Sequence, residues 1–466
     1  MGTDSRIVAK SGIWYAVSNI LVKATAFLTT PLFTRLLTQE QYGEYSNIAS
    51  WVTIFTVLTG FDAYTTVIRS KHDFDSDIDT YVSSVYFMNI AVTIVVFGLI
   101  YAFWNLLHPI FAIEKKYFPI IVLYLLVLPA YNLFVTKQRA YYKYKLFAAF
   151  TIITTLLSAI VSVILVLTLD NKLDGRVIGQ YIPPFIFYIF IAIFILFKGH
   201  KVKISYVKYA ATLSIPLVPH LLSLNILSSS ARIMLKQMCG AEMAALYSVD
   251  YNCVQIITIL FDSVNKAWAP WLMDALHEKE YSQTKKVSNI YFGAMMFLCL
   301  GILLIGPEII LILGGQSYMS AIWALPPLLV ACVFQVAYTM YVNVEFYMKK
   351  TVSVAVATGI AAVVNMILNF VFIPKFGFVA AGFNTLFSYI VLYIAHYIYL
   401  HRIKRAFTFE IKYINMGLLL MIGIMVVIYF LYHFDVIRWI LCTFYACIVL
   451  GFAIKYRKEL LGIVLK

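Results

Sequence analysis

Residues 11–34 read SGIWYAVSNILVKATAFLTTPLFT, a stretch long and apolar enough to cross a membrane but interrupted by a lysine near its middle. That residue, Lys23, lies about eleven residues, or roughly 16 Å, from either end, too far for its side chain to reach the headgroups. A charge in mid-span is costly and usually faces a polar cavity or a partner. Asn19 lies one turn away on the same face. We therefore expect this helix to line a water-filled cationic cavity; the alternative for Lys23 is a structural ion pair.

The composition excludes a soluble globular protein. Of the 466 residues, 62% are hydrophobic and 12% are charged, whereas soluble domains contain about 25% charged residues. The apolar segments are about 20 residues long, unlike the ~10-residue alternating strands of a membrane barrel. We therefore predict an all-α polytopic membrane protein, because helices satisfy their own backbone hydrogen bonds in lipid. The six cysteines are scattered through apolar segments and predict neither a disulfide framework nor a zinc site.

About fourteen transmembrane helices are predicted, joined by connections too short to hold a soluble domain. Most of the 36 lysines and arginines fall on one side of the membrane, which predicts cytoplasmic N- and C-termini. The net charge of +14 is therefore assigned to loops facing anionic membrane lipids and not to a nucleic-acid partner. The predicted spans are residues 11–34, 43–67, 80–106, 117–136, 146–169, 177–197, 208–234, 242–268, 287–313, 321–347, 351–373, 378–400, 413–433 and 436–455.

Two short segments with a common pattern indicate an internal repeat. Residues 40–46 (EQYGEYS) and 242–248 (EMAALYS) each sit at the turn between the first and second span of a group. An even number of spans separates the copies, so the two halves have the same orientation, as in the parallel repeats of transporters. The prediction is an N-terminal six-helix lobe (1–200), a C-terminal six-helix lobe (201–404) and two additional helices (405–466).

Polar side chains at helical spacing mark the expected interface between these lobes. The repeat places Asn225 of the seventh span opposite Lys23, and Arg232 lies two turns further along. Lys266 adds a positive charge to the eighth span. Together with Asn19, these residues form the expected substrate-binding set. Arg232 could instead be an interfacial anchor, as we expect for Lys236 and Arg35.

Three titratable residues within spans are candidates for ion coupling or gating. Asp250 lies inside the eighth span and has no evident local partner. Asp262 precedes Lys266 by one turn, and the alternative is that these two only pair with each other. His220 follows Pro219 in the seventh span and could titrate near neutral pH, although a hydrogen bond between helices is the commoner use.

Motifs for chemistry are missing from the sequence. It has no Gly-rich phosphate loop, no HExxH and no G-x-S-x-G, so we expect neither an enzyme nor a bound cofactor or metal. Asp73, Asp75, Asp77 and Asp79 form an acidic run that lacks the glycine and glutamate of a calcium loop. We expect this run to be a solvated loop.

Several short motifs, taken in order, resemble the polysaccharide-biosynthesis (Wzx-type) flippases of the MOP exporter superfamily. The resemblance extends over nearly the whole chain. Two departures from the family pattern are Ala231, where an aspartate is frequent, and Lys266, where a glutamine is common. The motifs are residues 30–38 (TPLFTRLLT), 42–45 (YGEY), 214–220 (SIPLVPH), 231–233 (ARI), 245–249 (ALYSV), 265–271 (NKAWAPW), 365–369 (NMILN), 373–377 (IPKFG) and 380–382 (AAG).

The resemblance implies a bacterial inner (cytoplasmic) membrane protein with a MATE-like fold that turns undecaprenyl-diphosphate-linked oligosaccharide from the inner to the outer leaflet. The glycan would be an O-antigen (lipopolysaccharide) or capsule repeat unit, and the polymerase of the same pathway would be a partner. Lys23, Arg232 and Lys266 suit a diphosphate. The alternatives are a multidrug or metabolite cation antiporter of the same superfamily, whose cavity would need acidic residues, and a helical scaffold for glycan assembly.

Overall fold

The structure is a computed structural model that describes residues 18, 21, 24–25 and 27–455. These residues form helices joined by short turns, and no strand occurs among them. Residues 27–36 are helical and precede α2. The α-helices that follow are α2 (Gln39–Gly60), α3 (Val67–Asp73), α4 (Ile78–Ala102), α5 (Trp104–Phe111), α6 (Phe118–Ala140), α7 (Tyr144–Thr168), α8 (Lys172–Gly199), α9 (Ile204–Ser214), α10 (Val218–Cys239), α11 (Ala241–His277), α12 (Tyr281–Leu304), α13 (Gly306–Gly314), α14 (Leu325–Tyr347), α15 (Thr351–Arg402), α16 (Ile411–Leu431) and α17 (Asp435–Lys455).

The predicted all-α membrane fold is confirmed. Ten of the described helices are long and apolar enough to cross a membrane, and the pair α2 and α3, bent by 47°, makes one more. The 52-residue α15 contains Gly377 with φ 59° and ψ −141°, so it is two helices joined at a kink. Each predicted span after the first therefore has a helical counterpart. The second span ends early because Phe61 and Asp62 adopt positive φ.

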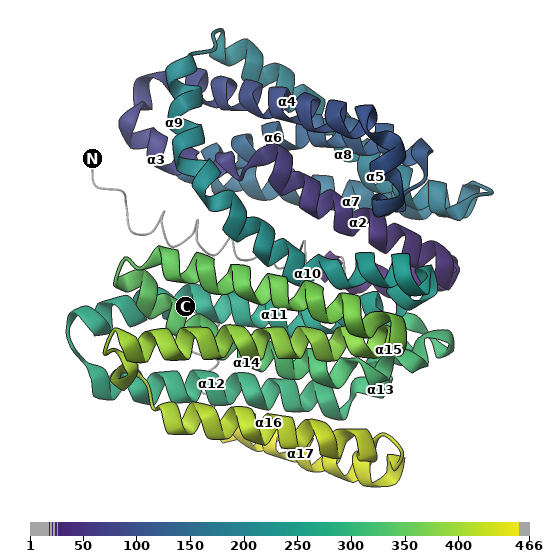
Figure 1. Cartoon of the computed structure of the whole chain (residues 1–466), viewed down its shortest axis with the longest axis vertical. Coiled ribbons are helices and arrows are strands. Elements are labelled where there is room, and N and C mark those ends of the chain that lie inside the picture. The colour runs from purple at the N-terminus through teal and green to yellow at the C-terminus, as the bar shows by residue number, and fades with distance from the viewer. Residues whose placement is uncertain (1–17, 19–20, 22–23, 26, 456–466) are drawn as a thin grey trace.

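Buried apolar side chains form two main clusters, and the helices around them form two bundles (Figure 1). We call the helices around the first cluster, α2 to α9, the first lobe. The second lobe consists of α10 to α15, with α16 and α17 packed along α12 and α14 at its edge. Within the first lobe α8 packs against α6 and α7, and within the second α15 packs against α10 and α14.

The described hydrogen bonds and ion pairs between the lobes lie at one end of the molecule, which we call the closed end. There the start of α2 packs against the end of α10 and the start of α11, at the right of Figure 1. A Cβ atom added to Gly43 would come within 1.8 Å of the Ala241 carbonyl oxygen. Only a glycine permits this approach, so Gly43 sets how closely the lobes meet.

The helices α9 and α10, which follow each other in the chain, pack in different lobes. The seventh predicted span is broken by the 3-10 turn η4 (Ile215–Leu217), which contains Pro216. On one side of this turn α9 packs against α4 and the 3-10 turn η1 (Ala63–Thr66) of the first lobe. On the other side α10 packs against α2, α11 and α15. Proline lacks the backbone donor that a continuous helix needs, which accounts for the break.

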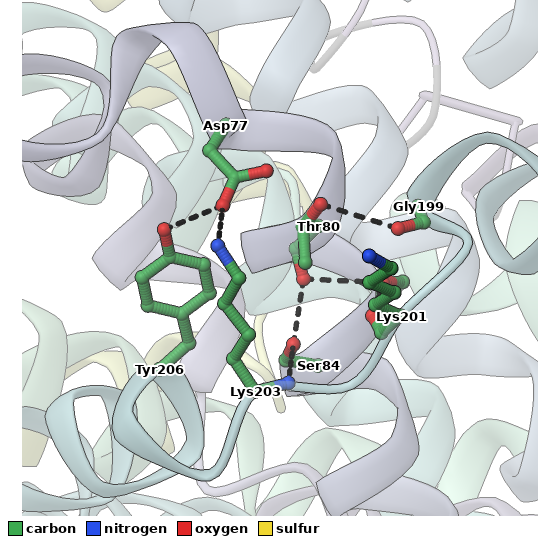
Figure 2. A network of polar contacts seen from close by, with 8 residues as sticks. Asp77, Thr80, Ser84, Gly199, Lys201, Lys203 and Tyr206 are labelled. Atoms are coloured by element: carbon green, nitrogen blue, oxygen red, sulfur yellow. Dashed lines mark hydrogen bonds and ion pairs between the residues drawn. The ribbon is translucent and has the colours of Figure 1, made fainter.

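A polar network fastens the connection between α8 and α9 to the first lobe (Figure 2). Asp77, in the 3-10 turn η2 (Asp75–Asp77), accepts hydrogen bonds from Tyr206 (2.7 Å) and from Lys203. The bond to Asp77 raises the pKa of Lys203. The Lys203 amide donates to the Ser84 hydroxyl at 3.0 Å, and the Thr80 hydroxyl donates to the Gly199 carbonyl at 3.2 Å.

The four carboxylates of the acidic run are exposed or half-exposed, as the sequence predicts, but they are also bonded. Each of its four carboxylates is bonded to a side chain from another helix or from the connection before α9. Asp73 accepts from Tyr209, Asp75 from Tyr141 at 2.6 Å, and Asp79 from Lys137. The bonding partners were not predicted, because they come from residues far along the sequence, which spacing alone does not reveal.

A second polar network lies inside the second lobe, where α10 meets both halves of α15. The Ser230 hydroxyl donates to Asn365 Oδ1 at 3.0 Å, and Asn369 Nδ2 donates to the same oxygen at 2.9 Å. Asn384 Nδ2 donates to Asn369 Oδ1 at 3.0 Å. These amides are buried and bonded to each other. They hold the second lobe together and do not line the space between the lobes.

Candidate functional site

A cavity of 310 Å³ lies between the two lobes, and its walls come from both of them. The first lobe and the helix before it contribute one aromatic ring and one hydroxyl. The second lobe contributes hydroxyl, amide and phenol groups and a single guanidinium. The lining residues are Phe27, Thr53, Ser228, Ser229, Arg232, Tyr251, Asn252 and Gln255.

Helical spacing explains why these side chains meet. Ser228 and Arg232 are four residues apart on α10, and Tyr251 and Gln255 are four residues apart on α11, so each pair shares one face. Asn252 Nδ2 donates to the Tyr42 hydroxyl at 3.0 Å, across the interface between the lobes. This bond closes the cavity on the side of the closed end.

Arg232 is the cationic group of this cavity. Its Nη2 donates to the Ser228 carbonyl at 3.1 Å, and its guanidinium lies 4.6 Å from the centre of the Tyr251 ring. Its Nε is buried and has no hydrogen-bond partner among the described residues. Within that part of the chain no carboxylate forms an ion pair with Arg232. A guanidinium has five donors, so Arg232 retains donors for an anionic ligand.

The structure separates two other predicted binding residues, Asn225 and Lys266, from this cavity. Asn225 is half-buried and donates to the Leu221 carbonyl of its own helix at 2.8 Å. Lys266 is exposed on α11, about three turns beyond Gln255 and away from the closed end. Lys23 and Asn19 lie outside the described residues. Of the predicted set, Arg232 is the residue that lines the cavity.

The three coupling or gating candidates lie apart from one another. Asp250 is fully buried, and neither of its oxygens has a hydrogen-bond partner among the described residues. It interacts electrostatically with Tyr429 of α16 and with Tyr432, the residue that follows this helix. Asp262 is half-buried and interacts with Tyr338 of α14. His220 is half-buried near the start of α10. None of them lines the cavity between the lobes.

Contacts at the closed end form a gate that sequence reasoning did not find. Lys236 Nζ donates to Glu44 Oε2 at 2.6 Å and also to the Ala112 carbonyl. Both side chains are largely buried, with exposed fractions of 14% and 25%. The sequence predicts Lys236 as an interfacial anchor. It holds the two lobes together instead, because its partner lies on α2 of the other lobe.

Reversing the Glu44–Lys236 pair tests this gate. Glu44→Gln leaves a largely buried ammonium without its carboxylate and is expected to weaken the closed end by about 1 kcal/mol. The double variant Glu44→Lys with Lys236→Glu is expected to recover most of that loss. The measurement is the distance between spin labels placed across the closed end. Equal distances in the wild type and in Glu44→Gln would contradict the assignment.

Two larger hollows lie outside the interface. One, of 780 Å³, is an apolar groove along α15 lined almost wholly by aliphatic and phenylalanine side chains, with Asn384 as its amide. The other, of 450 Å³, lies between α4, α6 and α8 and contains Lys137, Lys198 and Asp79, which are joined in ion pairs. Neither presents the unpaired guanidinium seen between the lobes.

The family model described as "Polysaccharide biosynthesis protein" matches residues 8–276, which is more than half of the chain. The chain belongs to this family. The match covers α2 to α11, and therefore the gate and the residues of the cavity. The predicted relationship to polysaccharide-biosynthesis proteins is confirmed.

Solved structures show the same fold in transporters and flippases. The lipid II flippase MurJ, in an inward closed conformation, matches with a TM-score of 0.70 at 14% identity, covering 96% of this chain and 100% of that one. An inward-facing multidrug resistance MATE family transporter of the MOP superfamily matches with a TM-score of 0.62 at 13% identity, covering 83% and 96%. A MOP superfamily transporter from Pyrococcus furiosus has a TM-score of 0.57 at 12% identity, covering 92% and 99%. A search of curated proteins by sequence gives no match.

These comparisons give the polysaccharide biosynthesis family protein a MOP-type fold. The protein crosses the membrane many times. At 14% identity or less, the structural neighbours establish the fold and not the substrate. The substrate has to be inferred from the groups that line the cavity.

Proposed function

We propose that this protein is a flippase for undecaprenyl-diphosphate-linked oligosaccharide, an O-antigen or capsule repeat unit. The observation that carries the proposal is Arg232, a guanidinium without a described acidic partner in a cavity between two lobes. A diphosphate is the part of this substrate that lipid excludes most strongly, and Arg binds phosphate through paired hydrogen bonds. Serine, asparagine, glutamine and tyrosine side chains around it suit the hydroxyls of a sugar.

The size of the cavity fits the head of such a substrate. At 310 Å³ it lies at the lower end of the volumes of ligand pockets, which run from about 300 to 1,000 Å³. The diphosphate and the adjoining sugar would occupy it, and the rest of the glycan would extend away from the closed end. Lys266, exposed further along α11, would add positive charge on that route.

Alternating access would carry the substrate between the leaflets. In this proposal the end opposite the closed end faces the cytoplasm of a bacterial inner membrane, where most loop lysines and arginines and both termini lie. Residues 1–200 and 201–404 would be the two moving lobes, and residues 405–466 would accompany the second. The polymerase of the same pathway would receive the product.

Lys23 remains the predicted second cation of the path. Lys23→Ala is expected to impair translocation of the lipid-linked glycan at a normal protein level, because the diphosphate loses one of its cationic partners. Translocation is measured as the appearance of the glycan in the outer leaflet. Full activity of the variant would remove Lys23 from the substrate path.

The alternative is a multidrug or metabolite cation antiporter, for which the fully buried carboxyl of Asp250 in the second lobe is the favouring observation. Cation export needs acidic groups in contact with the substrate. Among the described residues, the lining of the cavity contains Arg232 and no carboxylate. Export of a cationic dye from vesicles that contain the purified protein would favour this alternative.

The decisive experiment uses purified protein in vesicles loaded with undecaprenyl-diphosphate-linked oligosaccharide. We expect the protein to accelerate transfer of the glycan to the outer leaflet, where a membrane-impermeant glycosidase removes it. Vesicles carrying Arg232→Gln provide the matched control. Transfer at the protein-free rate would overturn the proposal.

A further inference from the structure

Two titratable side chains form a buried pair in the second lobe, apart from the cavity between the lobes. Glu345 lies near the end of α14 and His396 near the end of α15, with exposed fractions of 0% and 1%. Nδ1 of His396 and Oε1 of Glu345 are 2.6 Å apart. The other oxygen of Glu345, Oε2, accepts a hydrogen bond from the Ser353 hydroxyl at 2.5 Å. Both oxygens of the carboxyl group are therefore bonded.

The charge of this pair depends on a single proton. With a neutral imidazole and an ionised carboxylate, the buried pair carries one negative charge. When one more proton is bound, the pair is neutral as a whole, whether the proton rests on the ring or on the carboxyl. Burial of an uncompensated charge costs several kcal/mol per ion. The charge that the packed helices must accommodate therefore differs by one unit between the two forms.

The helix that carries His396, α15, packs against α10. Nε2 of His396 is buried without a hydrogen-bond partner among the described residues, and so is Nδ1 of His220 on α10. His220 is three residues after Leu217, the last residue of the broken turn, and about 18 Å along α10 from Arg232.

Other titratable and charged groups surround the pair. The Tyr338 ring of α14 stacks on His396 with centroids 5.8 Å apart, and Asp262 of α11 interacts electrostatically with Tyr338. Lys349 and Lys350 lie exposed in the turn between α14 and α15, where the Lys350 amide bonds the Glu345 carbonyl. Neither α12 nor α16, as far as the structure describes them, contributes an ion-pair partner to Glu345 or His396.

We propose that Glu345 and His396 form a proton-binding site, and that the proton is the ion coupled to movement of the lobes. The site holds its proton while α10, α14 and α15 pack as they do here. It releases the proton when α10 moves away and water reaches the pair. The physiological use of this site rests on the proposed transport function, whereas the proton-linked movement itself does not.

The test measures lobe movement without substrate. Spin labels attached at Lys145 of α7 and Lys286 of α12, two exposed or half-exposed positions in different lobes, report the separation of the lobes between pH 5 and 8. The labels are attached through unnatural amino acids because the chain has six cysteines. In the wild type we expect the ratio of molecules with separated lobes to molecules with close lobes to change with pH. For one proton, this ratio changes by at most tenfold per pH unit.

Glu345→Gln and His396→Asn keep hydrogen-bonding groups in place but remove the exchangeable proton. Both are expected to reduce the pH response to less than twofold over the same range. His401→Asn is the matched control, since His401 is exposed on the same helix and bonds only the Tyr397 carbonyl in the described contacts. It should respond like the wild type. Size-exclusion profiles and melting temperatures identify a variant that fails to fold. If either Glu345→Gln or His396→Asn fails to fold, the pH response of the remaining one tests the proposal.

Three outcomes would overturn the inference: a wild-type ratio independent of pH, a full pH response in Glu345→Gln or His396→Asn, or an equal loss in His401→Asn. The glycan is absent from this experiment, so its result is independent of the vesicle assay. A pH response that depends on Glu345, together with no glycan transfer, would retain the proton site and reject the proposed substrate.

Discussion

Gly43→Ala is expected to leave the protein unable to close the end at which its two lobes now meet. The added methyl group would lie 1.8 Å from the carbonyl oxygen of Ala241, and a backbone atom cannot move aside as a flexible side chain can. Overpacking of this kind costs up to about 3 kcal/mol, which corresponds to roughly a hundredfold shift between conformations. Translocation should fall by a similar factor, because alternating access requires both states.

Labels at Lys115 and Lys375, which are exposed in different lobes, measure the effect as a longer distance across the closed end. Gly60→Ala is the matched control, because Gly60 lies on the same helix and a Cβ atom there meets nothing within 4 Å. The control should keep the wild-type distance and rate. A wild-type distance in Gly43→Ala would show that the lobes do not close through this contact.

Arg232→Gln is expected to lower translocation ten- to a hundredfold at an unchanged protein level. Hydrogen bonds to a charged group contribute about 1.5–3 kcal/mol, and Arg232 is the cation of the described cavity lining. Arg232→Lys should retain part of the activity, since it keeps the charge but loses the planar, paired donors. The rate of glycan transfer in vesicles gives the comparison.

Arg69→Gln controls for loss of a positive charge alone. Arg69 lies outside the cavity, with an exposed fraction of 69%, and its ion pair with Asp73 is solvent-exposed. The exposed pair is worth little to stability, so this variant should transport like the wild type. If both substitutions reduced transport equally, net charge and not the cavity would be responsible.

The order of the helices could be predicted from the sequence because each span is recognised from its own residues and their immediate neighbours. Apolar length, short polar connections and the lysine and arginine bias are properties of neighbouring residues. Features that depend on packing were missed: the break at Phe61 and Asp62 and the bonded state of the acidic run. In both, partners come from other helices. The turn at Ile215–Leu217 differs, because Pro216 is a local signal for it.

The same distinction holds for the candidate site. Arg232 was predicted as part of a polar face at helical spacing, and it does line the cavity. Lys266 and Asn225 share that spacing but point elsewhere or bond their own helix. His396 gave no sequence signal, because its partner Glu345 is on another helix. Periodicity identifies a polar face, and packing decides what that face meets.

The fastening of α9 to the first lobe limits how the two halves can part. Because Lys203 and the start of α9 are bonded to α4 and its preceding turn, only residues Ile215–Leu217 join a helix held by one lobe to a helix held by the other. Three residues reach about 10 Å when fully extended. In the proposed alternating access, the two halves therefore swing on this short connection and do not separate fully. The size of the substrate that can pass between the lobes is then set by the angle through which they rotate, and not by the length of the segment that connects them.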